Sequence, residues 1–78
     1  MRVDMEDIIK QLMADILNID SRSIDDSTSI DNIESWDSMN HLNICLALEQ
    51  EFNISLEVDE MESMISFYDI VQVISTKI

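Results

Sequence analysis

The chain has 78 residues, 46% of them apolar, and its 17 acidic and four basic residues give a formal net charge of −13. A chain of this length forms a small domain with a modest core, which argues against a deep enzyme cleft. The acidic balance disfavours nucleic acid and anionic membranes as partners, whereas the apolar content suffices for folding, so we expect one globular domain over residues 1–78.

The first predicted element is a helix over residues 4–17. Asp4 is its expected N-cap, and Asp7 places a second acid at the positive end of the helix dipole. Asn18 is expected to end the helix in a left-handed turn. The apolar residues recur every three or four positions and form one amphipathic stripe: Met5, Ile8, Ile9, Leu12, Met13, Ile16 and Leu17.

Residues 19–36 show no sustained periodicity and are predicted to form a long loop. Long connections without secondary structure are uncommon inside small domains, so this loop is either functional or wrongly assigned. Its regularly spaced apolar residues indicate that it packs on the core: Ile19, Ile24, Ile30, Ile33 and Trp36. The acids do not follow the calcium-loop pattern and the chain has no glycine, so we expect no metal site.

A second helix is predicted from residue 38 to about residue 51, with Asp37 as N-cap and Asn53 as its stop. One side of it carries Ile44, Cys45, Leu48 and Phe52. The apolar surface continues around the helix through Met39, Leu42 and Leu46. This second set either packs in the bundle or stays partly exposed for docking, and the sequence does not separate the two interpretations.

The last part of the chain predicts a short helical segment over residues 59–63 and a final helix from Phe67 to about Thr76. Ser66 and Asp69 resemble a capping box, and the stripe that follows is Phe67, Ile70, Val71 and Ile74. No run predicts a strand pair. We therefore expect an all-α fold, a small four-helix bundle with three longer helices, one short helix and a long loop between the first two helices.

Ser38 lies between Asp37 and Met39, where the long loop meets the second helix. The tripeptide alone carries little weight because Asp, Ser and Met are common in this chain. Together with the order of elements, however, the segments Ser35-Trp36-Asp37-Ser38-Met39 and Ala47-Leu48-Glu49-Gln50-Glu51-Phe52 resemble the modification site and recognition helix of the acyl carrier protein family. The resemblance covers nearly the whole chain.

The resemblance implies that Ser38 receives 4′-phosphopantetheine from coenzyme A, through a separate phosphopantetheinyl transferase that uses Mg²⁺. It also implies that the chain is not an enzyme and has no catalytic residue, but carries acyl intermediates as thioesters on the arm. The geometry is compatible, because a phosphodiester at a helix start faces free backbone N–H groups. Outside this layout, Ser38 would be read as an ordinary helix-cap residue.

The resemblance further implies partner enzymes that load and process the acyl group. We expect them to contact the second helix through Asp37, Met39, Leu42, Leu46 and Glu49. That helix carries fewer acids than is usual for carriers of primary fatty acid synthesis, which hints at a specialised pathway with fatty, hydroxyacyl or polyketide cargo. Two alternatives stay open: an aminoacyl or peptidyl carrier, including the D-alanyl type, and an unmodified acidic protein-interaction module.

Two side chains of the second helix invite a catalytic interpretation. His41 has no second histidine or paired nucleophile, so we expect it at the surface. Cys45 falls on the apolar side, where a small buried thiol is common.

The compartment follows from three further features. Cys45 is the single cysteine, so no internal disulfide can form, and no apolar run approaches the ~20 residues of a membrane-spanning helix. The N-terminal segment is too acidic for a signal peptide. We expect a cytoplasmic monomer that does not insert into membranes.

Overall fold

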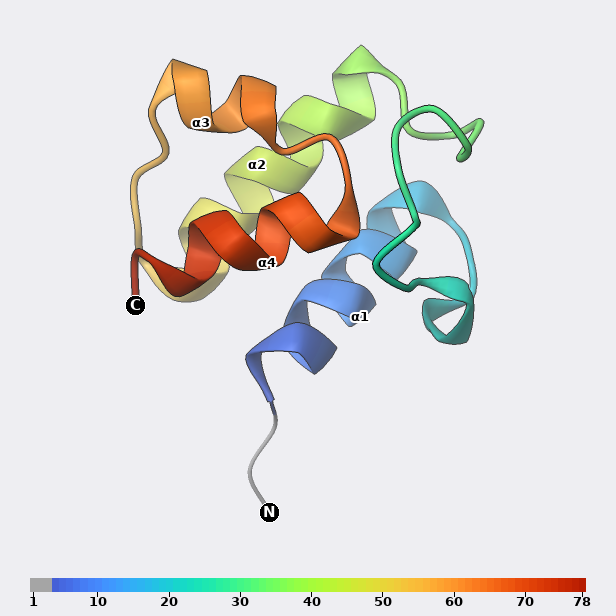
Figure 1. The fold of residues 1–78 in the computed structure, drawn as a ribbon, viewed down its shortest axis with the longest axis horizontal. Helices are drawn as coiled ribbons and strands as arrows, with labels where there is room; N and C mark the ends of the chain where they lie inside the picture. Colours follow the sequence, from blue (N-terminus) through green and yellow to red (C-terminus); the bar gives the residue numbers. More distant parts are fainter. Residues whose placement is uncertain (1–3) are drawn as a thin grey trace.

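The structure, a computed structural model, describes residues 4–78, so the predicted domain of residues 1–78 begins three residues before the described part. Figure 1 shows an all-α fold in this part, as the sequence predicts. Its elements are α1 (Met5–Leu17), a 3₁₀ turn (Ser21–Ser23), α2 (Ser38–Phe52), α3 (Val58–Ser63) and α4 (Phe67–Ser75). None of these helices is long and apolar enough to cross a lipid bilayer.

The helices form a small bundle in which α1 packs against both α2 and α4. In Figure 1, α3 and α1 lie on opposite sides of the molecule with α4 between them, and the long loop covers one end of the bundle. The helix ends follow the predicted chemistry. Asn18 and Asn53 end α1 and α2 in left-handed conformations, with φ of 57° and 53°.

The side-chain caps are only partly as predicted. Asp37 accepts a hydrogen bond of 2.9 Å from the backbone N–H of Asn40, and Ser66 caps α4 in the same way. Asp4 occupies the N-cap position of α1, but its carboxylate accepts no capping hydrogen bond, so this part of the prediction was wrong. The carboxylate that reaches back to an N-cap backbone N–H is found at α3, where Glu60 accepts from Glu57 at 2.8 Å.

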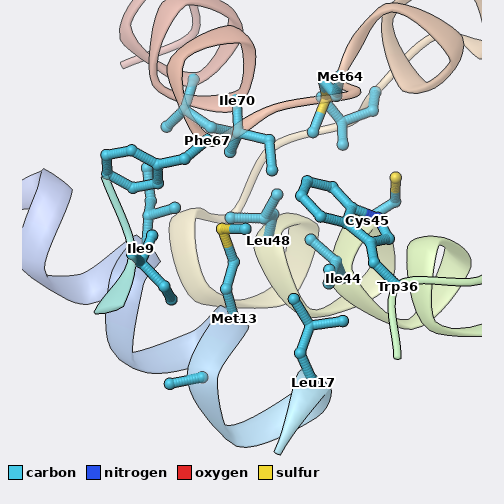
Figure 2. Packing of buried hydrophobic residues seen from close by; sticks show 14 residues of the cluster. Ile9, Met13, Leu17, Trp36, Ile44, Cys45, Leu48, Met64, Phe67 and Ile70 are labelled. Atoms are coloured by element: carbon cyan, nitrogen blue, oxygen red, sulfur yellow. The ribbon is translucent and has the colours of Figure 1, made fainter. Parts of the chain in front are cut away.

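The hydrophobic core draws on α1, α2, α4 and the loops (Figure 2). Its largest fully buried side chains include Ile9, Met13, Leu17, Ile44, Leu48, Met64, Phe67, Ile70 and Ile74. Each contributes roughly 1.5–3 kcal/mol through removal of its apolar surface from water. Ile24 and Trp36, both 2% exposed, bring the long loop into the same core. The prediction that the loop packs on the core is thereby confirmed.

Backbone contacts also join the long loop to the start of α4. The N–H of Ile30 donates to the carbonyl of Ile65, and the N–H of Phe67 donates to the carbonyl of Thr28, each at 2.9 Å. These bonds flank an isolated antiparallel bridge between Ser29 and Ser66. Because they pair backbone groups that are far apart in the chain, no pattern in the sequence predicts them.

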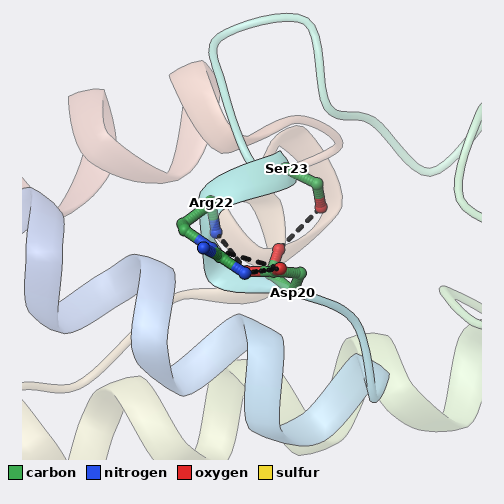
Figure 3. Close-up of polar contacts among 3 residues, drawn as sticks. All are labelled: Asp20, Arg22 and Ser23. Carbon is green, nitrogen blue, oxygen red and sulfur yellow. Dashed lines mark hydrogen bonds and ion pairs between the residues drawn. The ribbon is translucent and has the colours of Figure 1, made fainter.

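The 3₁₀ turn after α1 is held by Asp20 (Figure 3). Its carboxylate pairs with the guanidinium of Arg22 at 2.8 Å, and its carbonyl accepts a bond of 2.6 Å from the hydroxyl of Ser23. The Arg22 hydrogen bonds keep the pKa of the Asp20 carboxyl below its ordinary value. Both side chains are largely exposed, so the pair orders the turn and adds little to stability.

Candidate attachment site

Ser38 is the first residue of α2, directly after the N-cap Asp37. Its side chain is exposed, and none of the hydrogen bonds between residues 4–78 involves its hydroxyl. The backbone N–H groups of Ser38 and Met39 lie in the first helical turn, where no preceding carbonyl can pair with them. The hydroxyl is thus accessible from solvent at the positive end of a helix of 15 residues.

The segment before Ser38 is fixed on both neighbouring helices. The side-chain amide of Asn40, in the first turn of α2, donates from Nδ2 to the carbonyl of Ser35 at 2.8 Å. The hydroxyl of Ser35 in turn donates to the carbonyl of Leu17 at 2.7 Å. The N–H of Asp37 also donates to the Ser35 carbonyl, at 3.0 Å. Ser38 is therefore exposed directly after a well-anchored turn, where the long loop meets α2.

Trp36 and His41 form a second anchor of this turn. The buried indole of Trp36 donates from Nε1 to Nδ1 of His41 at 3.0 Å, and the two rings stack with centroids 6.1 Å apart. Nε2 of His41 lies 2.7 Å from the carbonyl oxygen of Met61 in α3. Since both ring nitrogens are engaged and the side chain is partly buried, the expectation that His41 is a surface residue was wrong. A buried indole N–H needs an acceptor, so the sequence signals that Trp36 requires one nearby but does not identify it as His41.

The exposed apolar residues of α2 form one face next to Ser38. Met39, Leu42 and Leu46 are 75%, 51% and 50% exposed, and their spacing places them on the same side of the helix. The structure thus decides between the two interpretations of this set in favour of exposure. Asp37 is exposed at the start of this face.

Glu49 differs from the other residues predicted to contact partners. It is half-buried, and its Oε2 accepts a hydrogen bond of 2.8 Å from the backbone N–H of Leu56. Its carboxylate therefore fastens the connection between α2 and α3 while its remaining surface borders the apolar face.

Cys45 lies in the core, as the sequence predicts. Burial, assisted by the negative charge of Glu49, raises the pKa of its thiol, which disfavours the reactive thiolate. Its Sγ is 4.0 Å from Nε2 of His41, but that nitrogen is already 2.7 Å from the Met61 carbonyl. The pair therefore lacks the free base that an activated nucleophile requires.

These features fit a covalently attached phosphodiester. Ser38 offers an exposed oxygen for the ester bond, and the first turn of α2 offers unpaired N–H groups for the phosphate charge. No described basic side chain neutralises the site. Lys10 lies over the Phe67 ring, while Arg22 and Lys77 pair with Asp20 and Glu60.

Known proteins share both the sequence pattern and the fold. The family described as the phosphopantetheine attachment site matches residues 7–74. Among solved structures, the holo acyl carrier protein from Geobacter metallireducens is similar with a TM-score of 0.83 and 23% identity, over 96% of this chain and 86% of that chain. The holo acyl carrier protein from Nitrosomonas europaea gives a TM-score of 0.80 at 22% identity, over 95% of each chain.

The matched fold and sequence define a carrier protein of the phosphopantetheine-attachment type. The chain belongs to the family described as the phosphopantetheine attachment site. Its prosthetic group is a covalently attached phosphopantetheine, and members of the family are carriers rather than enzymes. As a carrier it interacts with a phosphopantetheinyl transferase and with biosynthetic enzymes.

Proposed function

We propose that Ser38 is the residue that carries the phosphopantetheine arm, and that the chain transports acyl intermediates between enzymes of fatty acid, polyketide or related specialised biosynthesis. The observation that carries the assignment is the exposed, unbonded hydroxyl of Ser38 at the first position of α2, inside the matched residues 7–74. When attached, the arm supplies a terminal thiol that holds the cargo as a thioester.

This chain contributes position and charge to the modification and leaves the bond-making step to the transferase. Ser38 Oγ attacks the phosphorus of the coenzyme A diphosphate that is bonded to pantetheine, and adenosine 3′,5′-bisphosphate leaves from that phosphorus. The hydroxyl proton of Ser38 passes to a base of the transferase. His41 does not serve as that base, because its two nitrogens are engaged with Trp36 and Met61. The lack of a local base supports a carrier that does not catalyse its own modification.

The exposed face of α2 supports a role in partner recognition. Met39, Leu42 and Leu46 present apolar surface beside Ser38, with Asp37 at one end and Glu49 at the other. We assign these five residues to contacts with the transferase and with the enzymes that load and process the acyl group. Apolar side chains that stay exposed next to a reaction site are typical of docking surfaces.

Intact-mass measurement tests the attachment. The purified chain is incubated with coenzyme A, Mg²⁺ and a broad-specificity phosphopantetheinyl transferase, and one phosphopantetheine adduct is expected. Ser38→Ala should abolish the adduct, whereas Ser55→Ala, a change at another exposed serine, should keep it. A chain that stays unmodified with several competent transferases would be an acidic interaction module instead.

The cargo is tested on carrier isolated from its native cells. Fragmentation of the holo form releases the arm with its thioester, and the mass of the released group reports the cargo. An acyl or hydroxyacyl mass supports the proposal. An amino acid or peptide mass would assign the chain to the aminoacyl or peptidyl carriers, including the D-alanyl type.

A further inference from the structure

One imidazole joins three separate parts of the chain. His41 belongs to the first turns of α2, its Nδ1 is 3.0 Å from the indole Nε1 of Trp36 in the long loop, and its Nε2 is 2.7 Å from the carbonyl oxygen of Met61 in α3. These three groups are called the His41 bridge below. The bridge spans the segment in which Ser38 lies, since Trp36 precedes Ser38 by two residues and His41 follows it by three.

The two hydrogen-bond partners of the neutral His41 ring select its tautomer. The indole N–H of Trp36 can only donate, so Nδ1 must carry no proton, and the Met61 carbonyl can only accept, so Nε2 must carry one. Only the neutral Nε2–H tautomer makes both bonds. The opposite tautomer would lose both bonds, and an imidazolium would lose the one from Trp36.

The contact matters to α3 because that helix has few other attachments. α3 has six residues and none of its side chains is fully buried. Met61 packs partly on the core, and Glu60 pairs with Lys77 at 2.8 Å. The Met61 carbonyl, in the last turn of α3, accepts from the backbone N–H of Met64 at 3.3 Å, and His41 Nε2 adds a second, shorter contact at 2.7 Å.

The contact matters to the attachment site for a different reason. Trp36 is 2% exposed, and its indole N–H has His41 as its hydrogen-bond acceptor. Without that acceptor, a buried donor would be left unpaired and the indole would favour another position. The turn that presents Ser38 would then lose one of its two anchors, the other being the Ser35 contacts described above.

We propose that His41 is a positioning residue of the attachment site, which couples the turn before Ser38 to α3 through the His41 bridge. Loss of the hydrogen bond to Trp36 or to Met61 then shifts the tautomer of His41, and this shift weakens the other hydrogen bond. This inference rests on the proposed function only in taking Ser38 as the modified residue. It predicts that a change in the His41 bridge alters both α3 and the modification site, although the Ser38 hydroxyl belongs to α2.

The test combines a spectroscopic signature with variants. In the apo wild type, ¹⁵N shifts of the imidazole should show the Nε2–H tautomer. Trp36→Phe removes the donor in the loop, and it should raise the Nδ1–H population and speed hydrogen exchange of the amides of α3. His41→Phe should also speed this exchange, whereas His41→Gln, which retains one acceptor and one donor, should restore slow exchange.

Transferase kinetics give the second readout. Trp36→Phe and His41→Phe should each lower kcat/KM for modification of Ser38 about fivefold to tenfold, the typical effect of one lost hydrogen bond. His41→Gln and the control Gln50→Ala, an exposed residue of α2, should stay near the wild-type value. The modification should still reach completion in every variant.

The outcomes separate the two proposals. If wild-type chain is not modified on Ser38, the proposed function fails, but the tautomer and exchange measurements still test the bridge. A dominant Nδ1–H tautomer in the wild type would overturn the inference, and that measurement needs no variant to fold. Unchanged exchange in α3 of a folded Trp36→Phe variant would overturn it as well.

Discussion

The hydroxyl of Ser35 donates a hydrogen bond of 2.7 Å to the carbonyl oxygen of Leu17, across 18 residues of sequence. Leu17 is the last residue of α1, where carbonyl groups lack partners within the helix. The bond therefore gives the Leu17 carbonyl a donor and also holds the end of the long loop against α1. Because the same Ser35 accepts from the Asn40 amide through its carbonyl, it joins α1 to α2 just before Ser38.

Removing this hydroxyl should destabilise the fold. Ser35→Ala deletes the donor and leaves the partly buried Leu17 carbonyl unpaired, so we expect the free energy of unfolding to fall by about 1–2 kcal/mol. Urea denaturation followed by circular dichroism measures the change. Ser55→Ala is the matched control at an exposed serine and should stay within about 0.5 kcal/mol of wild type. Equal stability of the two variants would contradict the role given to Ser35.

The helices could be predicted from the sequence because their signals are local. The amphipathic stripe of α1, the N-cap Asp37 and the two asparagines at helix ends all act within a few residues. The predicted helix boundaries, residues 4–17, 38–51, 59–63 and 67–76, lie within one residue of the observed ones. Asp4 shows the limit of this reasoning, since a residue can occupy the cap position without making the bond.

The contacts of the long loop and of His41 could not be predicted in the same way. His41 bonds to a backbone carbonyl 20 residues later, and Ile30 to one 35 residues later, and a backbone carbonyl leaves no signal of residue type. The apolar face of Met39, Leu42 and Leu46 was ambiguous for a related reason. Whether a third side of a helix is covered depends on where distant elements pack, which periodicity along one helix does not encode.

Leu42 offers a test of the proposed docking face that leaves the core intact. Its side chain is 51% exposed, so Leu42→Ala should change the free energy of unfolding by no more than about 0.5 kcal/mol. If partners bind this face, the variant should weaken binding to the transferase by about 1 kcal/mol or more. Isothermal titration calorimetry with an inactive transferase measures the affinity.

The matched control for Leu42 is another exposed apolar residue away from α2. Ile65 is 47% exposed and lies between α3 and α4, so Ile65→Ala removes a comparable apolar surface. Its affinity for the transferase should equal that of the wild type. Equal losses in both variants would indicate a diffuse apolar contribution and would contradict a docking face centred on α2.

The ion pair between Glu60 and Lys77 predicts a pH dependence with a defined sign. Hydrogen bonding to the Glu57 backbone, and then to Lys77, lowers the pKa of the Glu60 carboxyl from its ordinary value of 4.5. A carboxyl with a lowered pKa in the folded state adds stability above its unfolded pKa and loses it as pH falls through the folded one. Glu60→Gln should therefore be less stable than wild type at pH 7, and the difference should shrink on acidification below pH 4.5.

The high net charge adds a second effect to the stability difference between Glu60→Gln and wild type, and a control variant is needed to separate the two. At −13, removal of any exposed acid relieves repulsion and by itself stabilises the folded chain. Glu62→Gln, a change at an exposed residue of the same helix, measures that effect alone. The melting temperature of Glu60→Gln should lie below that of Glu62→Gln at pH 7, and the two should converge as pH falls toward 3 and Glu60 becomes protonated. If Glu60→Gln instead matches Glu62→Gln at pH 7, the pair with Lys77 does not hold α3, and the His41 bridge with the partial packing of Met61 remains as its attachment.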